Sequence, residues 1–551
     1  MLASLIWLLA GVGVFIVGMN FMSDALEKSA GTGMKRMLER ISNNRFSGVG
    51  IGAGVTAIIQ SSSATSVMVI GLVNAGVMTL MQATPIIMGA NIGTTITGLL
   101  VALKNDVFNL LMYFLAFAGV MMGFFKKEKI KIAGSLCCGL GLIFVGLNIM
   151  SSEQAFGNPL IEEMFTNIFR KINFPLLLIL VGAIFTALLQ SSSAATGVVI
   201  TMVGASVLPL ELALFIVLGV NIGTCVTALL ASVGANANSK RVALIHFTFN
   251  VIGTVLFTAL LWILKEPAVN FLVSLFPGTD IMSLQMRVSI FHVIFNVTTT
   301  ALLLPFTKLL VKYSTLVIKD KKAEEEITLK YVDDRLLQTP PIALMQVKKE
   351  MDYMLALVEE NINLSLESLV TGNLAGGEKV KSNEKIINFT NGALTKFLIK
   401  LSPTASPSDE RVIGSYFHVI NDLERIGDHA ENFYGIAEEM GDKEIAFSEV
   451  GRKEISKMRE KIFGMLDISK DAFENLNKEK LPKLTELENQ VDKMKKELIK
   501  NHFARLAEGN CCIDVSPYYS SAVTGLERVA DHLVNVGYSI LNPIGSQKAN
   551  V

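Results

Sequence analysis

The chain has 551 residues, 51% of them hydrophobic, and a mean hydropathy of +0.48. This composition excludes an ordinary soluble globular protein and predicts an integral membrane protein. The 49 basic and 49 acidic side chains balance, and no basic cluster interleaved with aromatic residues indicates nucleic-acid binding. The five cysteines show no zinc-type spacing.

Charge divides the chain into two parts. Residues 1–312 carry 29 of the 98 charged side chains, and residues 313–551 carry the other 69. We therefore predict a membrane transport domain over 1–312, a linker over 313–339 and a helical domain over 340–545.

Apolar runs of about 20 residues predict seven membrane crossings. The first run has neither a basic segment before it nor a cleavage site after it, so we interpret it as a transmembrane helix and not as a signal peptide. The predicted crossings are 4–22, 83–103, 107–125, 132–150, 209–231, 242–264 and 288–310.

Two polar motifs recur at one spacing. Gln60–Ser63 (QSSS) recurs as Gln190–Ser193, and Asn91–Thr94 (NIGT) recurs as Asn221–Thr224, both at an offset of 130 residues. A weaker match at an offset of 128 relates the first and fourth predicted crossings. Matches in one order at nearly one spacing indicate an internal duplication. We place the repeats at about 4–125 and 132–264, followed by a further helix at 288–310.

The QSSS motifs interrupt two apolar stretches, 46–77 and 174–207. The apolar segment on either side of each motif is too short to cross a bilayer, so we predict re-entrant hairpins with the motif at the tip. Three crossings and one hairpin per repeat make the second repeat inverted. The predicted fold is therefore all-α, with two inverted repeats that each contain a re-entrant hairpin, followed by a bundle of two three-helix units.

Basic residues orient this topology in the inner or plasma membrane. The predicted loops 23–46, 126–131 and 232–241 hold five, four and two basic residues, whereas the opposite loops hold one, two and two. The positive-inside rule then predicts an external N-terminus and a cytoplasmic C-terminal domain.

The repeated motifs predict an ion site. Residues 46–103 include no charged side chain but many hydroxyl and carboxamide groups, which are neutral oxygen ligands suited to an alkali cation. The half-helix that begins at each tip would favour an anion through its free N–H groups. Glycines around Asn91 and Asn221 predict local unwinding there. The alternative is that these small residues only serve close helix packing.

A smaller repeat pairs His246 and Asn250 with His292 and Asn296. These residues could line a polar path or respond to protons. We prefer the interpretation that neighbouring helices satisfy them.

The paired QSSS and NIGT motifs resemble the type II sodium-phosphate cotransporter family in its bacterial form, over roughly residues 1–312. The resemblance implies sodium-driven movement of inorganic phosphate by alternating access, with the two tips and nearby Asn and Thr residues as the binding centre. Cys225 stands where the first repeat has Thr95, which puts a sodium ligand there in doubt. The candidate phosphate- and sodium-binding residues are Gln60, Ser61, Ser62, Ser63, Thr65, Asn91, Thr94, Thr95, Gln190, Ser191, Ser192, Ser193, Thr196, Asn221 and Thr224.

The polar half contains a second duplication. Apolar residues at spacings of three and four predict helices, and breaks near 372–377, 403–408, 441 and 509–517 divide them into six. Leu423–Asn432 matches Leu526–Asn535 at an offset of 103. Each copy places a Glu and an Asp on one helical face, where carboxylates could bind a hard or borderline cation. The alternative is a structural network with the adjacent arginines.

The doubled Glu-Arg-x-x-Asp-His pattern resembles the PhoU family over roughly 340–545. That resemblance implies phosphate-linked regulation and a divalent or iron-type metal. The metal ligands it implies are Glu424, Asp428, Glu527 and Asp531.

We therefore predict a sodium-phosphate cotransporter regulated by a cytoplasmic PhoU-like domain. Its partners would be inorganic phosphate, sodium and membrane lipid, with a homo-oligomer left open. The alternatives are a membrane-anchored phosphate sensor and a transporter of another small anion or neutral solute. An enzyme is disfavoured because no nucleophile–base pair or nucleotide-binding loop is evident.

Overall fold

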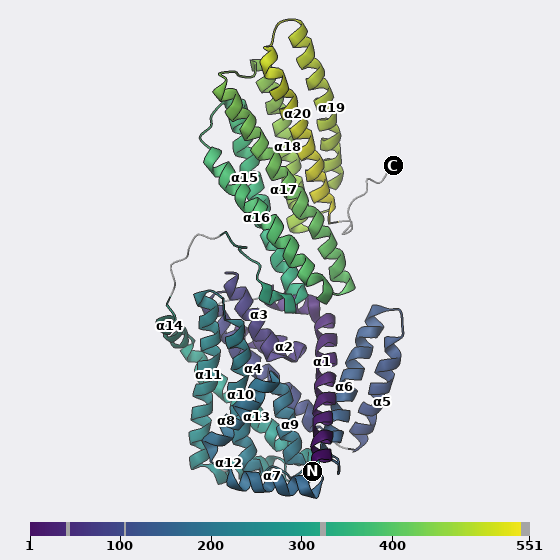
Figure 1. Cartoon of the computed structure of the whole chain (residues 1–551), viewed down its shortest axis with the longest axis vertical. Helices are drawn as coiled ribbons and strands as arrows, with labels where there is room; N and C mark the ends of the chain where they lie inside the picture. Colours follow the sequence, from purple (N-terminus) through teal and green to yellow (C-terminus); the bar gives the residue numbers. More distant parts are fainter. Residues whose placement is uncertain (40–43, 104–105, 173, 320–326, 541–551) are drawn as a thin grey trace. The chain divides into compact units, whose positions relative to one another are not determined.

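The computed structural model describes residues 1–39, 44–103, 106–172, 174–319 and 327–540. All regular elements in these ranges are helices (Figure 1). The chain divides into two compact units, Met1–Lys322 and Ala323–Val551. Part of the predicted linker (320–326) and the end of the predicted C-terminal domain (541–545) lie outside the described residues.

Six helical stretches of the first unit are long and apolar enough to cross a membrane, which confirms an all-helical, multi-pass membrane protein. The seventh predicted crossing corresponds to α5 (Asp106–Gly123), whose described apolar part is shorter. The six are formed by α1 (Leu2–Glu39), α4 (Leu80–Ala102), α6 (Glu128–Ser151), α10 (Leu210–Ala231), α11 (Ala237–Ile263), and α13 (Ile281–Leu303) continued through η1 (Leu304–Phe306) into α14 (Thr307–Val317).

Two pairs of short helices contain the QSSS motifs. The first pair is α2 (Arg45–Ile59) and α3 (Ser62–Asn74), and the second is α8 (Pro175–Leu189) and α9 (Ser192–Gly204). The helices of each pair have 15 and 13 residues and are about 20 Å long, which is less than the roughly 30 Å of a bilayer core. The predicted interruption at each motif is confirmed.

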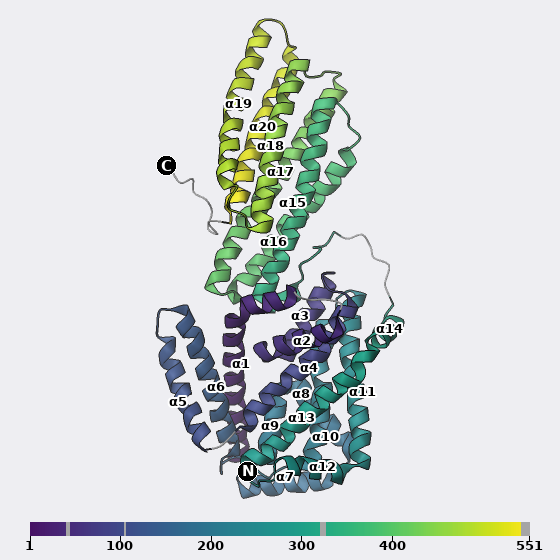
Figure 2. The ribbon, with the colours of Figure 1, turned by 180° about the vertical axis from the view of Figure 1, so that it is seen from behind.

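Three features of this unit differ from the predicted loops. α1 continues to Glu39, where a loop was predicted from residue 23, because no proline interrupts the segment. Two short helices, α7 (Pro159–Lys171) and α12 (Lys265–Leu275), lie at the same end of the unit (Figures 1 and 2). Pro159 at the start of α7 and the Asn158 cap explain why a helix begins there.

The helices packed against the short pairs approach through glycines. A Cβ on Gly52 of α2 would collide with the carbonyl of Ile86 in α4, and a Cβ on Gly89 of α4 would collide with the carbonyl of Val49. The same backbone contacts recur between α8 and α10 in the second repeat. The expected unwinding around Asn91 and Asn221 is therefore wrong: α4 and α10 are continuous helices whose glycines permit close packing.

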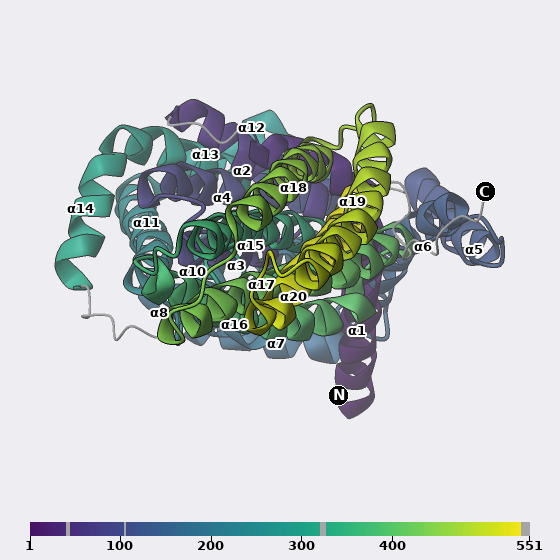
Figure 3. The same cartoon turned by 90° about the horizontal axis from the view of Figure 1, so that it is seen from above.

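α5 and α6 stand beside α1 at one edge of the first unit, and α14 lies at the opposite edge (Figures 1 and 3). α6 contacts both α1 and α5 extensively. The buried apolar core of the unit draws its side chains mainly from α1, α6, α8, α9, α10 and α13.

Residues 327–540 of the second unit contain six α-helices. The first three pack on one another, as do the last three, and α17 joins the groups by packing against α20. The helices are α15 (Pro340–Thr371), α16 (Gly377–Leu401), α17 (Pro407–Asp442), α18 (Glu449–Asn475), α19 (Leu481–Ala507) and α20 (Ser516–Tyr538).

We predict that Gly52→Ala destabilises the membrane unit by about 1–3 kcal/mol through overpacking against α4. Gly50→Ala, two residues earlier in α2, is the matched control, because a Cβ there meets no atom within 4 Å. Thermal unfolding in detergent should show a lower midpoint for Gly52→Ala only. Equal midpoints would contradict the close contact.

Candidate functional site

The two QSSS tips have the same backbone geometry. Gln60 and Gln190 each end a helix in the left-handed conformation, with φ of 59° and 53°. This conformation costs a non-glycine residue about 1–3 kcal/mol and is typical of functional sites. The structure therefore places the same strained turn at both tips.

A serine starts the next helix at each tip. Ser61 and Ser191 are extended, and each Oγ accepts a hydrogen bond from a backbone N–H, of Ala64 at 3.1 Å and of Ala194 at 3.2 Å. The serines thus cap α3 and α9 and orient the first N–H groups of both helices.

Crossed hydrogen bonds join the two tips. Thr97 of α4 donates to the Gln60 side-chain oxygen at 2.7 Å and accepts from Ser193 of the second tip at 3.4 Å. In the other repeat, the Thr227 hydroxyl of α10 shares its hydrogen between Ser63 of the first tip, at 3.1 Å, and the carbonyl of Thr224, at 2.9 Å. α4, which follows the first tip, thus contacts the second tip, and α10, which follows the second tip, contacts the first.

Thr97 and Thr227 were not among the predicted binding residues. They are separated by the same 130 residues as the motifs, so the repeat spacing could have identified both as an equivalent pair.

Several buried hydroxyls near the tips have no protein partner. Ser66 and Thr196, one turn into α3 and α9, are each 1% exposed, and neither hydroxyl makes a hydrogen bond within the described ranges. The Thr186 hydroxyl, just before the second tip, is also unpaired there. A buried hydroxyl without a partner is costly, so these oxygens fit contact with an ion or water.

The first tip has more internal bonds than the second. Thr56 donates to Thr65 at 2.9 Å, and Thr65 donates to the carbonyl of Ser61 at 3.0 Å. At the constant offset, the counterpart of Thr65 is Ala195, so this chain cannot form in the second repeat. The Gln60 side chain is half-buried and bonded to Ala57, whereas that of Gln190 is exposed.

Among the described residues, the NIGT side chains make their hydrogen bonds outside the QSSS tips, although the carbonyl of Thr224 accepts from Thr227 at 2.9 Å. Asn91 donates to Asn250 at 2.9 Å, and its oxygen lies 3.4 Å from His246 Nε2. Asn221 donates to the carbonyl of Val217 in its own helix at 3.3 Å. The hydroxyls of Thr94, Thr95 and Thr224 also bond carbonyls of their own helices.

Cys225, at the position of Thr95, also belongs to this layer, since Asn250 donates to its sulfur at 3.2 Å. Asn91, Cys225, His246 and Asn250 thus form a packed polar layer between α4, α10 and α11. A role of the NIGT residues in phosphate or sodium binding stays a prediction.

In the second unit, three of the four repeated carboxylates lie near cationic side chains. Arg425 is 3.8 Å from Glu424 and 3.5 Å from Asp428, and Lys495 is 2.9 Å from Glu527. In the part of the chain that the structure describes, no three His, Cys, Asp or Glu side chains are arranged to share a metal ion.

Glu384 of α16 adds a third carboxylate beside the first pair. It is 2% exposed, and neither oxygen has a hydrogen-bond partner among the described residues. Burial, followed by repulsion from Asp428, Glu431 and Glu424, raises the pKa of Glu384 to about 7. The Asn388 amide is near enough to offset part of this rise, but it does not reach hydrogen-bonding geometry. An uncompensated carboxylate at this position fits a bound cation.

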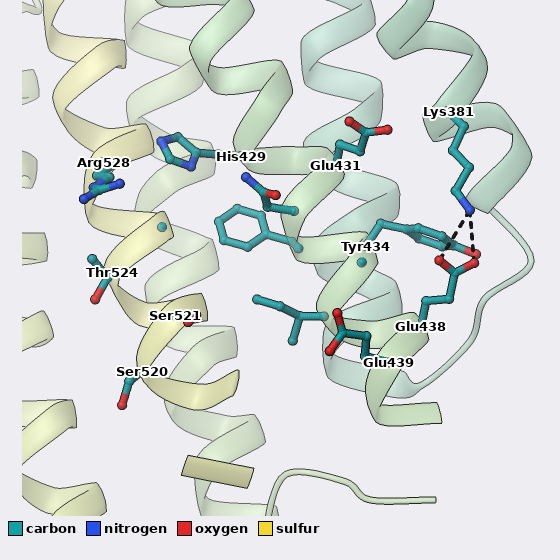
Figure 4. Close-up of a pocket in the computed structure, with 15 residues that line it drawn as sticks. Lys381, His429, Glu431, Tyr434, Glu438, Glu439, Ser520, Ser521, Thr524 and Arg528 are labelled. Carbon is teal, nitrogen blue, oxygen red and sulfur yellow. Dashed lines mark hydrogen bonds and ion pairs between the residues drawn. The ribbon is translucent and has the colours of Figure 1, made fainter. Parts of the chain in front are cut away.

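A pocket of about 780 Å³ adjoins the motif copies between α16, α17 and α20 (Figure 4). Arg528 and His429 lie at one side, and the ion pair of Lys381 with Glu438, at 3.1 Å, lies at the other. The rings of His429 and His532 are 6.1 Å apart, so the two copies of the motif meet where α17 packs on α20.

Comparisons with known proteins agree with this two-part organisation. The sequence model of the Na+/Pi-cotransporter family matches residues 14–152 and 157–286, and that of the PhoU domain matches 352–437 and 455–540. The uncharacterized protein YqeW of Bacillus subtilis is 30% identical over 309 residues, which cover 56% of this chain and 96% of YqeW.

The chain belongs to the Na+/Pi-cotransporter family.

Two further relatives carry functional names. The "Putative inorganic phosphate export protein YjbB" of Escherichia coli is 24% identical over 553 residues, 98% of this chain and 97% of YjbB. The mouse "Sodium-dependent phosphate transport protein 2C" is 39% identical over 153 residues, 25% of either chain. This Na+/Pi-cotransporter family member is therefore a phosphate-transport membrane protein with two PhoU-type units.

We predict that Thr227→Val lowers phosphate transport roughly five- to tenfold, because it removes the hydroxyl that bonds Ser63 across the tips. Thr201→Val is the control, since that buried hydroxyl bonds only the carbonyl of Gly197 in its own helix. Phosphate flux in proteoliposomes with equal amounts of folded protein measures the effect. Equal flux in both variants would show that the crossed bond is dispensable.

Proposed function

We propose that this protein is a sodium-coupled inorganic phosphate cotransporter that works by alternating access, with phosphate and sodium bound between the two QSSS tips. The observation that carries the proposal is the crossed hydrogen bonding of Thr97 and Thr227, which unites the two repeats in one centre. Net uptake or export would follow the gradients.

The chemistry of the tips suits both solutes. Serine-capped helix starts present N–H groups and the positive ends of two helix dipoles to a phosphate oxyanion. The unpaired hydroxyls of Ser66, Thr186 and Thr196 are neutral oxygen ligands of the kind that sodium accepts. No acidic residue lies between Phe46 and Leu103 to repel the anion.

The difference between the tips supports alternating access. Gln60 is bonded and half-buried, whereas Gln190 is exposed. In an alternating-access cycle, the two inverted repeats exchange conformations, so at any one time their equivalent motifs have different surroundings.

Two contacts support re-entrant hairpins of opposite direction. Asn74, at the end of α3, accepts a hydrogen bond from the N–H of Asn236, in the loop predicted to be cytoplasmic, at 2.8 Å. Gly204, at the end of α9, packs against Gln285, at the start of α13, on the predicted external side. Each hairpin would then return to the side from which its chain entered.

We predict that Gln60→Ala and Gln190→Ala each reduce sodium-driven phosphate flux at least about tenfold, because each removes a polar group from the shared centre. Gln154→Ala, in the exposed segment after α6, is the control. Flux of labelled phosphate into vesicles with and without a sodium gradient gives the measurement. Wild-type flux in either tip variant would refute a shared centre, and flux indifferent to sodium would refute the coupling.

We predict that single cysteines at positions 28 and 153 label from opposite faces of the membrane. Lys28 and Glu153 are both exposed, and α1 and α6 place them at the predicted cytoplasmic and external sides, respectively. An impermeant thiol reagent applied to intact cells should modify only the cysteine at 153. Labelling of both positions from one face would rule out inverted repeats.

We propose that the PhoU-type units form a cytoplasmic regulatory domain that binds metal through Glu424 and Asp428 in one copy and Glu527 and Asp531 in the other. The buried carboxylate of Glu384 supports the first site, because its two unpaired oxygens lie beside the pair. The competing interpretation is the arginine network, which the contacts of Arg425 favour.

Elemental analysis of the purified full chain tests the metal. We predict bound divalent or iron-type metal that falls when Glu424 and Asp428 become Gln and Asn. A Glu449→Gln variant, whose exposed carboxylate pairs with Lys453, should retain the metal. Metal-free protein whose melting is unaffected by chelator or added metal would show that the carboxylates are structural.

A further inference from the structure

The helix α13 carries a buried polar stripe that the tip site does not use. Its members recur at spacings of four, three, four and three, which places them within about 80° of one another around the helix. All five side chains are at most 1% exposed. They are Gln285, Ser289, His292, Asn296 and Thr299.

Most of these side chains have atoms without a protein partner. Within the described residues, both amide atoms of Gln285, both ring nitrogens of His292, the Asn296 oxygen and the Thr299 hydroxyl make no hydrogen bond. Each such group in an apolar core is costly. At four positions along α13, those of Gln285, His292, Asn296 and Thr299, the buried polar atoms therefore require partners that are not protein side chains.

The comparable face of α11 is largely satisfied. His246 and Asn250 share hydrogen bonds with Asn91, and Thr254 donates to the carbonyl of Leu218 at 3.2 Å. His246 thus has a partner at Nε2 and none at Nδ1 among the described residues, whereas His292 has none at either ring nitrogen.

Glycines of three other helices face the stripe. Gly204 of α9 lies against the Gln285 amide, and Gly253 of α11 lies against Thr299. Gly98 of α4 faces Ser289 and His292, and a Cβ there would be 3.5–3.9 Å from its nearest neighbours. At that level the structure has room for a further small group next to the His292 ring.

We propose that the α13 stripe is a hydrated proton path through the membrane unit, separate from the phosphate and sodium centre. It extends over 14 residues from Gln285 to Thr299, or about 21 Å, and its levels are about 5–6 Å apart, which one water molecule can bridge with two hydrogen bonds.

The stripe suits protons better than sodium. Its hydroxyl, amide and imidazole groups can both donate and accept hydrogen bonds, whereas sodium requires oxygen ligands alone. A proton would pass from water to water, and at His292 one ring nitrogen would accept a proton while the other released one.

No other titratable side chain belongs to the stripe. α4 and α9, which pack against α13, carry none. Arg287, on α13 itself, is bonded to the carbonyls of Phe276 and Gly278. The titratable groups of the other helices packed on α13 are Glu211 and Cys225 of α10, Lys240, Arg241 and His246 of α11, and Lys265 and Glu266 of α12.

The test uses the full chain in proteoliposomes without sodium or phosphate. A potassium gradient with valinomycin drives protons inward, and an internal dye reports the pH. Proton entry should exceed that of empty liposomes. Thr299→Val should reduce the proton entry above that of empty liposomes roughly tenfold, because it removes one hydroxyl of the stripe. Thr300→Val is the matched control, because its hydroxyl instead faces the carbonyl of Met88 at 3.4 Å, and it should stay within about twofold of the unmodified chain.

A second variant tests the path sterically. Gly98→Ala should also block proton entry, since it fills the space beside His292 without a close contact, and the second repeat already has alanine at the equivalent position 228. Proton entry equal to that of empty liposomes, or equal in Thr299→Val and Thr300→Val, would overturn the proposal in favour of static buried water. Sodium-driven phosphate flux in the same vesicles tests the cotransport proposal independently.

Discussion

A helix that ends inside an apolar core leaves backbone N–H and C=O groups without partners, and four helices of the membrane unit begin or end at the QSSS tips. The left-handed glutamine at each tip reverses the chain in two residues, and the following serine caps the next helix at once. Because the turn is compact, the two tips can approach closely enough for hydroxyl groups to join them. The glycine contacts of α4 and α10 with the preceding short helices hold the tips in this position.

Sequence alone was sufficient for features that depend on local pattern. Apolar runs gave the long helices, and the doubled motifs gave the duplication, the interruption of the short helices and the family. The crossed contacts of Thr97 and Thr227 depend on side chains 96 and 164 residues apart in sequence, which no local pattern encodes. Asn91 shows the converse, because a motif position that looked like a tip ligand is packed against α11. The short helices α7 and α12 were missed because their apolar content is too low to register as a crossing.

The two repeats are more alike in sequence than in the side-chain contacts of their equivalent residues. Thr65 has an alanine counterpart, so the hydroxyl chain of the first tip is absent from the second. His246 and His292 share a motif, but in the part of the chain that the structure describes only His246 has a hydrogen-bond partner, at Nε2. Such differences matter for the alternating-access mechanism that we propose. If both halves had identical partners, neither the inward nor the outward arrangement would be preferred, and each departure from identity biases the equilibrium between them.

The same argument applies to the PhoU-type units. Glu384 stands beside Glu424 and Asp428, but the equivalent residue of the second copy, 103 positions later, is Leu487. The first copy therefore concentrates carboxylates where the second copy has an apolar side chain and a lysine contact to Glu527. A cation at the first copy would offset both the burial and the repulsion from neighbouring carboxylates that raise the Glu384 pKa. Metal affinity should thus differ between copies of one motif. Occupancy of the first copy would then respond to pH near neutrality, because protons compete with the metal for the same carboxylate.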